Sequence, residues 1–166
     1  NIPVPTSYMA SNSAYDFLGG YEHDTKCGLL HVADHHVSPG KKQWTWGYSD
    51  FGQAWDRNLT DEDGPYIELM TGVYTDNQPD FAWIMPYEHK TFSQYFLPYR
   101  ELGLIKNASK DILLGLEGKE GQIDLKLFCT SKQAVLTLEL IYNKECLIKE
   151  AISIDPEHIF ERTVPF

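Results

Sequence analysis

IDLKLFC, residues 123–129, and AVLTLELI, residues 134–141, are the segments that decide the fold class of this chain. Apolar and polar side chains alternate along both, which is the period of a β-strand that buries one face. In the first segment, Leu125, Leu127 and Cys129 share the apolar side. A glycine-bounded turn at 118–121 precedes it, as expected for a hairpin. The two segments therefore predict strands of an antiparallel sheet.

Short apolar stretches separated by turn-forming residues continue outward over the rest of the chain. This arrangement is typical of an all-β protein, and we predict an antiparallel β-sandwich. No prominent helix is expected. Residues 49–56 are predicted to be irregular. Residues 88–97 have a helix-like spacing of aromatics, but they lie between two prolines, so an irregular or extended segment is an equal alternative to a helix. The further strands that we expect are 28–33, 41–48, 66–74, 81–85, 105–116, 145–154 and 160–164.

The composition predicts one main folded domain. A chain of 166 residues with 42% hydrophobic content is large enough to bury a core. Residues 1–20 are predicted to be an extended arm or linker, and residues 21–166 a single β-sandwich domain. This domain has an aromatic and acidic half, 31–99, and a plain sheet half, 104–166, which we expect to carry little chemistry. Because the chain opens with Asn-Ile-Pro-Val-Pro, we expect it to be part of a longer protein.

The charge balance limits the classes of partner. The formal net charge of −10 opposes binding to nucleic acid or to an anionic membrane surface, since both require clustered Lys and Arg. The three cysteines have no metal-ligand spacing and are expected to be free, buried thiols in a reducing, cytoplasmic setting. No apolar run is long enough to span a bilayer. We expect no cofactor and no bound metal.

All four tryptophans lie within residues 31–99, interleaved with acids and amides. A sugar ring needs such a mixture, because it has an apolar C–H face to stack and a rim of hydroxyls to hydrogen-bond. The alternative is that the aromatics fill the core and the acids lie in solvated loops. The ligand-binding candidates are Trp46, Asp56, Glu68, Asn77, Gln78 and Trp83.

Two carboxylates and one histidine are the candidates for catalysis. Paired carboxylates carry acid–base chemistry on sugars, which makes Glu68 and Glu88 candidates. If Ile67 and Leu69 face the core, Glu68 faces a cleft or water. His35 is the candidate proton donor.

Two clusters have the residue types of metal ligands. His31, Asp34, His35 and His36 could bind a divalent cation. However, adjacent His35 and His36 would point to opposite faces of an extended chain, so hydrogen-bonded loop histidines are the favoured interpretation. The acidic loop that contains Asp61, Glu62 and Asp63, close to Asp56, lacks the full ligand spacing of a calcium loop, and we interpret it as a solvated turn.

Four segments carry a resemblance to a known family: SPGKKQWTWG (38–47), FGQAWDRNLTDEDGPYIELMTGVYTDNQPDF (51–81), PYEHKTFSQYFLPY (86–99) and LGLIKNAS (102–109). The chain resembles a bacterial domain of unknown function that precedes tetratricopeptide repeats and is similar to galactose-mutarotase-like β-supersandwiches. The resemblance implies a sugar cleft on a concave sheet, with Trp46, Asp56, Glu68, Asn77 and Gln78 near it. Mutarotases use a histidine acid and a glutamate base, but their own sequence motifs are absent here.

Three hypotheses about function follow. The first is a carbohydrate-recognition domain, binding mono- or oligosaccharides, within a larger sugar-acting or sugar-sensing protein. The second is a mutarotase-like or glycosidase-like enzyme domain. The third is a structural module that has no ligand and packs against other domains of its parent chain, such as tetratricopeptide repeats.

Overall fold

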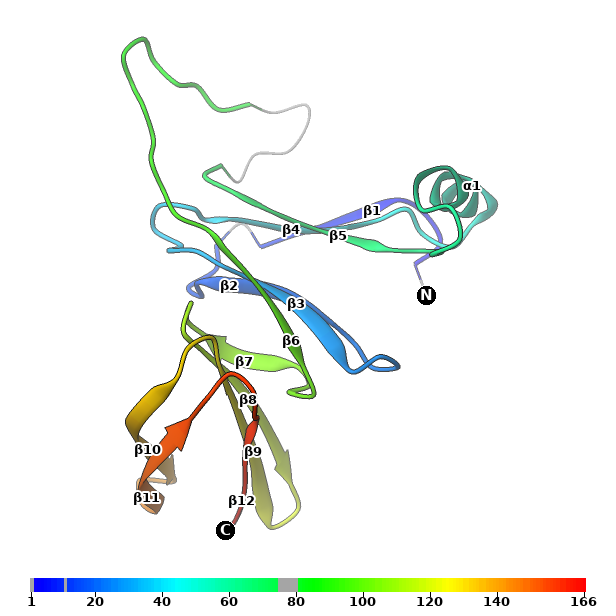
Figure 1. The fold of residues 1–166 in the computed structure, drawn as a ribbon. Helices are drawn as coiled ribbons and strands as arrows, with labels where there is room; N and C mark the ends of the chain where they lie inside the picture. Colours follow the sequence, from blue (N-terminus) through cyan, green and yellow to red (C-terminus); the bar gives the residue numbers. More distant parts are fainter. Residues whose placement is uncertain (1, 11, 75–80) are drawn as a thin grey trace. The chain divides into compact units, whose positions relative to one another are not determined.

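The computed structural model describes residues 2–10, 12–74 and 81–166 (Figure 1). Within these ranges the chain forms one α-helix and a series of β-strands. In chain order they are β1 (Thr6–Met9), β2 (Phe17–Glu22), β3 (Cys27–Val32), β4 (Gly40–Thr45), α1 (Asp50–Leu59), β5 (Ile67–Gly72), β6 (Tyr95–Arg100), β7 (Ile105–Ala108), β8 (Ile112–Lys119), β9 (Gln122–Cys129), β10 (Gln133–Tyr142), β11 (Glu145–Ile154) and β12 (Phe160–Pro165).

The strands form antiparallel sheets, so the predicted all-β antiparallel class is confirmed. The strand orders are β1-β4-β5, β2-β3-β6 and β12-β9-β8-β7, together with the hairpin β10-β11. The chain forms two compact units, residues 1–18 with 33–93, and residues 19–32 with 94–166. The first unit contains β1-β4-β5 and α1. β1 and the start of β2 fall within the predicted arm, 1–20, and the predicted single domain over 21–166 stays a prediction.

The alternating segment 123–129 forms β9 as predicted, and its apolar side is buried. Leu125, Leu127 and Cys129 join Ile152 and Ile154 of β11 in one hydrophobic core. Side chains of β8 and β10 complete this core, so the β10-β11 hairpin covers one face of the four-stranded sheet. Burial of about 25 cal/mol per Å² of apolar surface stabilises this two-layer arrangement.

The prediction of an irregular segment at 49–56 is wrong, because Asp50–Leu59 is helix α1. Ser49 precedes it with extended backbone, and Asp50 places a negative charge in its first turn, which favours a helix start. The buried positions of α1 are Gly52 and Asp56. The large apolar residues Phe51, Trp55 and Leu59 have helical spacing, but their side chains are exposed, whereas a glycine and an acid take the buried positions of α1.

Two strand predictions also need correction. Residues 81–85 form no strand, and the side chains of Phe81 and Trp83 are each 81% exposed. The expected strand over 105–116 is divided into β7 and β8. The hydroxyl of Ser109 accepts hydrogen bonds from the backbone N–H groups of Asp111 and Ile112, at 3.2 and 3.1 Å, and this local turn interrupts the strand.

The cysteines are free, as expected, but they are not all buried. Cys129 is fully buried, whereas Cys27 and Cys146 are exposed. In the part of the chain that the structure describes, no helix combines the length and the apolar character needed to cross a membrane.

Candidate functional site

Four aromatic side chains form a cluster where α1 meets the end of β4. Trp46 and Trp55 are stacked, with ring centroids 5.1 Å apart and an interplanar angle of 10°. Trp44 meets the edge of Trp46 at 5.6 Å, and Phe51 lies 6.3 Å from Trp46. Phe51 and Trp55 are one helical turn apart, so they share a face of α1. Their exposed fractions are 57% and 40%. This aromatic cluster, Trp44, Trp46, Phe51 and Trp55, is thus accessible to a ligand.

A carboxylate lies beside the aromatic cluster. The indole N–H of Trp46 donates a hydrogen bond to the hydroxyl of Tyr66 at 3.2 Å, and that hydroxyl donates to Oε1 of Glu68 at 3.1 Å. Glu68 is also the cross-strand partner of Trp44 in the β4-β5 ladder. Ile67 is 64% exposed and Glu68 is half-buried, so the condition that Ile67 faces the core is not met. Glu68 therefore lies on the cluster side of β5.

Two glycines allow the backbone of α1 to approach closely the chain that follows β4, which brings the aromatic side chains of the cluster together. A Cβ atom added to Gly52 would lie 2.2 Å from the carbonyl oxygen of Gly47 and 2.6 Å from that of Trp46. Gly47 itself has a φ of +78°, which favours glycine. The side-chain amide of Gln53 donates to the carbonyl oxygen of Tyr48 at 2.7 Å. These contacts seat α1 on the chain that leaves β4.

Asp56, a predicted ligand-binding residue, is only 3% exposed and lies on the inner side of α1. Neither carboxylate oxygen has a hydrogen-bond partner within the described residues. Its backbone carbonyl accepts hydrogen bonds from the N–H and the hydroxyl of Thr60, which close the helix. A buried carboxylate without a partner destabilises the folded state.

We therefore expect the Asp56→Ala variant to be more stable than the wild type by about 1–3 kcal/mol, because it removes an unsatisfied buried group. Urea unfolding followed by tryptophan fluorescence measures this change. Asn58→Ala, at an exposed position of the same helix, controls for the higher helix propensity of alanine. A less stable Asp56→Ala variant would show that the carboxylate has a stabilising partner, such as a cation.

His35 and His36 are not arranged as the sequence analysis predicted. The rings of His35 and His36 do not point apart, because their centroids are only 3.9 Å from each other. Asp34 begins a turn in which its carbonyl oxygen accepts from the N–H groups of Val37 and Ser38, so the chain is not extended here. His31 belongs to the other unit, where it is buried and packs 5.3 Å from the ring of Phe96.

Each of the two loop histidines is paired with an aspartate. Nδ1 of His35 lies 2.7 Å from Oδ1 of Asp16, and Nδ1 of His36 lies 3.0 Å from Oδ1 of Asp34. The side-chain hydrogen bond from His35 lowers the pKa of Asp16, and the backbone and side-chain hydrogen bonds from His36 lower the pKa of Asp34. Both carboxylates are therefore ionised at neutral pH.

The remaining candidates do not join the aromatic cluster. Oε2 of Glu88 accepts a hydrogen bond from the N–H of Met85 at 2.9 Å, so this carboxylate closes a local turn. Trp83 is 81% exposed, outside the aromatic cluster. Asn77 and Gln78 lie outside the described residues. Sequence reasoning missed Phe51, Trp55 and Tyr66 as site residues. The one-turn spacing of Phe51 and Trp55 could have indicated that they share one face of a helix, if the helix had been recognised.

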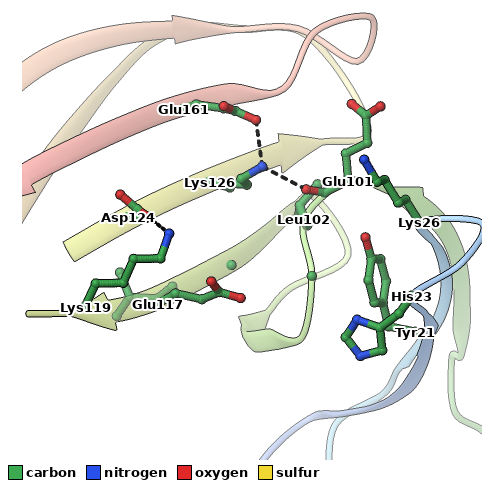
Figure 2. Close-up of a pocket in the computed structure, with 13 residues that line it drawn as sticks. Tyr21, His23, Lys26, Glu101, Leu102, Glu117, Lys119, Asp124, Lys126 and Glu161 are labelled. Atoms are coloured by element: carbon green, nitrogen blue, oxygen red, sulfur yellow. Dashed lines mark hydrogen bonds and ion pairs between the residues drawn. The ribbon is translucent and has the colours of Figure 1, made fainter. Parts of the chain in front are cut away.

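The second unit contains a polar pocket of about 480 Å³, which the plain appearance of residues 104–166 did not predict. In Figure 2, Lys126 lies between Glu101 and Glu161, and Lys119 pairs with Asp124. Nζ of Lys126 is 2.8 Å from the carboxylate of Glu161 and donates to the carbonyl oxygen of Glu101 at 3.1 Å. The other lining residues are Tyr21, His23, Lys26, Leu102, Gly103, Gly115, Leu116 and Glu117.

An aromatic pair lies along one side of this pocket. Tyr21, which lines it, stacks on Tyr99 with a centroid separation of 5.9 Å. Burial raises the pKa of Tyr99 to about 12, with a smaller contribution from Tyr21. Tyr99 faces Gly28 across the β3-β6 ladder, and a Cβ atom at Gly28 would lie 2.4 Å from the tyrosine ring. The glycine therefore provides the space that the ring occupies.

Fold and site together define an all-β protein of antiparallel sheets, with an aromatic cluster and a neighbouring carboxylate where its short helix meets a sheet. The chain belongs to the family described as Domain of unknown function (DUF5107), whose profile matches residues 1–99. Residues 107–166 match the profile described as YphG-like protein, second domain. No solved structure matches the chain. The family match covers the whole aromatic cluster, and the second match covers the sheet half of the chain.

Proposed function

We propose that this chain is a carbohydrate-recognition domain of a larger sugar-acting or sugar-sensing protein. The observation that supports it best is the Trp46–Trp55 stack, partly exposed, with the hydrogen-bonded pair of Tyr66 and Glu68 next to it. An indole face provides the apolar platform on which the C–H face of a pyranose packs. The adjacent carboxylate provides an acceptor for hydroxyl groups.

The hydrogen-bond chain also orients the carboxylate for this role. The hydroxyl of Tyr66 donates to Oε1 of Glu68, and the carboxylate carries a second acceptor oxygen, Oε2. A hydroxyl of the sugar would donate to this second oxygen. The net charge of −10 is compatible with a neutral ligand of this kind.

The more specific parts of the proposal follow from the resemblance of the sequence to the bacterial domain of unknown function described above. We include in it a galactose-mutarotase-like supersandwich, a bacterial and cytoplasmic setting, and tetratricopeptide repeats as neighbouring domains. The antiparallel all-β fold supports the first of these points. Recognition is favoured over catalysis, because Glu68 accepts its hydrogen bond from the hydroxyl of Tyr66 rather than from a histidine acid.

We expect mono- or oligosaccharides, tested as a panel that includes galactose, to quench the tryptophan fluorescence of the wild type. Trp55→Ala and Glu68→Gln should each weaken binding by about tenfold, since a hydrogen bond to a charged group contributes about 1.5–3 kcal/mol and an aromatic contact about 1 kcal/mol. Trp83→Ala, outside the aromatic cluster, is the matched control and should bind as the wild type does. Isothermal titration calorimetry gives the affinities.

The absence of any response across the panel would contradict the proposal and favour the second candidate, a packing module. One observation supports that candidate: Phe81, Trp83, Met85 and Tyr87 are all more than half exposed. An apolar run of this kind would be covered by another domain of the parent chain.

A further inference from the structure

The turn that follows β3 brings metal-ligand groups together. One potential ligand atom from each of Asp34, His35 and His36 lies within 4.8 Å of the other two. The two imidazole rings lie side by side, with centroids 3.9 Å apart and an interplanar angle of 41°. Three donors at such separations need only small side-chain rotations to reach a common ion, because zinc–nitrogen and zinc–oxygen bonds are about 2.0–2.2 Å long.

We propose that Asp34, His35 and His36 form a binding site for a borderline divalent cation, with zinc as the expected ion. This site is separate from the aromatic cluster and does not depend on the proposed sugar binding. Two imidazole nitrogens and one carboxylate are a donor set that suits zinc, nickel or copper, whereas calcium and magnesium require more oxygen ligands.

The ligands are held by contacts that metal sites commonly contain. Oδ1 of Asp16 accepts a hydrogen bond from the backbone N–H of His35 at 2.9 Å and lies 2.7 Å from Nδ1 of the same residue. A carboxylate bound to one ring nitrogen fixes the orientation of the imidazole and leaves Nε2 to coordinate the ion. We therefore assign Asp16 as a positioning residue rather than a ligand.

The other two ligands, Asp34 and His36, are held by hydrogen bonds within the turn. Oδ1 of Asp34 accepts from the backbone N–H of His36 at 2.9 Å, and the carbonyl oxygen of Asp34 accepts from the N–H of Ser38 at 2.8 Å. The side chains of Asp34 and His36 are 63% and 77% exposed, so an ion can enter from solvent. Three protein ligands leave a fourth position for water or for another ligand.

A second aspartate–histidine pair in the chain provides an internal comparison. Oδ1 of Asp155 accepts from the backbone N–H of His158 at 3.0 Å and lies 3.0 Å from its Nδ1, much as in the Asp34–His36 pair. Among the described residues, Asp155 and His158 belong to no group of three potential metal ligands. A hydrogen-bonded aspartate–histidine pair alone is therefore not a proposed metal site. What distinguishes the Asp34–His36 pair is the adjacent ring of His35, which Asp16 orients.

The test is calorimetric titration of the whole, chelator-treated chain with zinc chloride at pH 7. We expect one zinc ion per chain. His35→Ala and His36→Ala should each weaken binding at least about tenfold, and Asp16→Asn should weaken it by about 10–100-fold, as loss of a carboxylate partner does elsewhere. His158→Ala should bind zinc as the wild type does. Cobalt(II) bound in place of zinc should give visible absorption bands that His36→Ala abolishes.

Because His36 is largely exposed, its replacement should leave the fold intact, and the far-ultraviolet circular dichroism spectrum verifies this. Zinc binding by the wild type no stronger than by a His35→Ala, His36→Ala double variant would overturn the proposal. Equal weakening by His158→Ala would also overturn it, since binding would then reflect surface histidines in general.

Discussion

The Gly52→Ala variant is expected to be less stable than the wild type and to lose the sugar affinity proposed for the aromatic cluster. In an exposed helix this substitution would stabilise the protein by about 0.5–1 kcal/mol. Here the new Cβ atom would lie 2.2 Å from the carbonyl oxygen of Gly47 and 2.6 Å from that of Trp46. Backbone atoms cannot rotate away, so α1 must shift, at a cost of about 1–3 kcal/mol.

The shift of α1 would separate Trp55 from Trp46, because the two rings are carried by the helix and by the chain after β4. Near-ultraviolet circular dichroism, which reports the coupling of stacked indoles, should lose intensity, and urea unfolding should show the lower stability. Asn58→Ala on the exposed side of the same helix is the control. A Gly52→Ala variant as stable as this control, with an unchanged spectrum, would show that α1 does not rest on residues 46–47.

The second large effect is expected at Gly115 in β8. A Cβ atom there would lie 2.4 Å from the backbone carbonyl oxygen of Leu102, a residue that is only 3% exposed. Since the obstacle is again backbone and the site is buried, Gly115→Ala should lower the free energy of unfolding by about 1–3 kcal/mol. Both residues line the polar pocket, so the pocket should change shape as well.

Gly118 lies on the same strand and is the matched control. Nothing lies within 4 Å of a Cβ atom placed there, and Gly118→Ala should be neutral or stabilise the strand by about 0.5–1 kcal/mol. Chemical unfolding of the two variants in parallel measures the difference. Equal stability of the two variants would mean that the chain around Leu102 does not pack against β8 as the structure shows.

The strands that sequence analysis located well are those with one buried and one exposed face. In β9 the apolar positions 123, 125, 127 and 129 are all buried, because side chains alternate between faces of a strand and only one face covers the core. Residues 81–85 are all apolar, yet their large side chains are exposed and the segment forms no strand. Apolar content without a partner strand does not make a strand, since backbone groups must also be paired.

Part of the candidate site could also be predicted. Trp46 and Glu68 were identified from their chemistry, and the structure brings them together. It does so through Tyr66, which sequence analysis did not single out, and through Trp55, whose position depends on an unpredicted helix. Asp56 shares that helix but faces the interior.

The sequence by itself determined the all-β class and the apolar faces of its regular strands, because the period of two along a strand is a local property. Only the tertiary structure decided where α1 packs, which indole stacks on Trp46, and that His35 and His36 lie side by side. These features depend on backbone approach at Gly47 and Gly52 and on hydrogen bonds to residues distant in the chain, such as Asp16, and no local pattern encodes them.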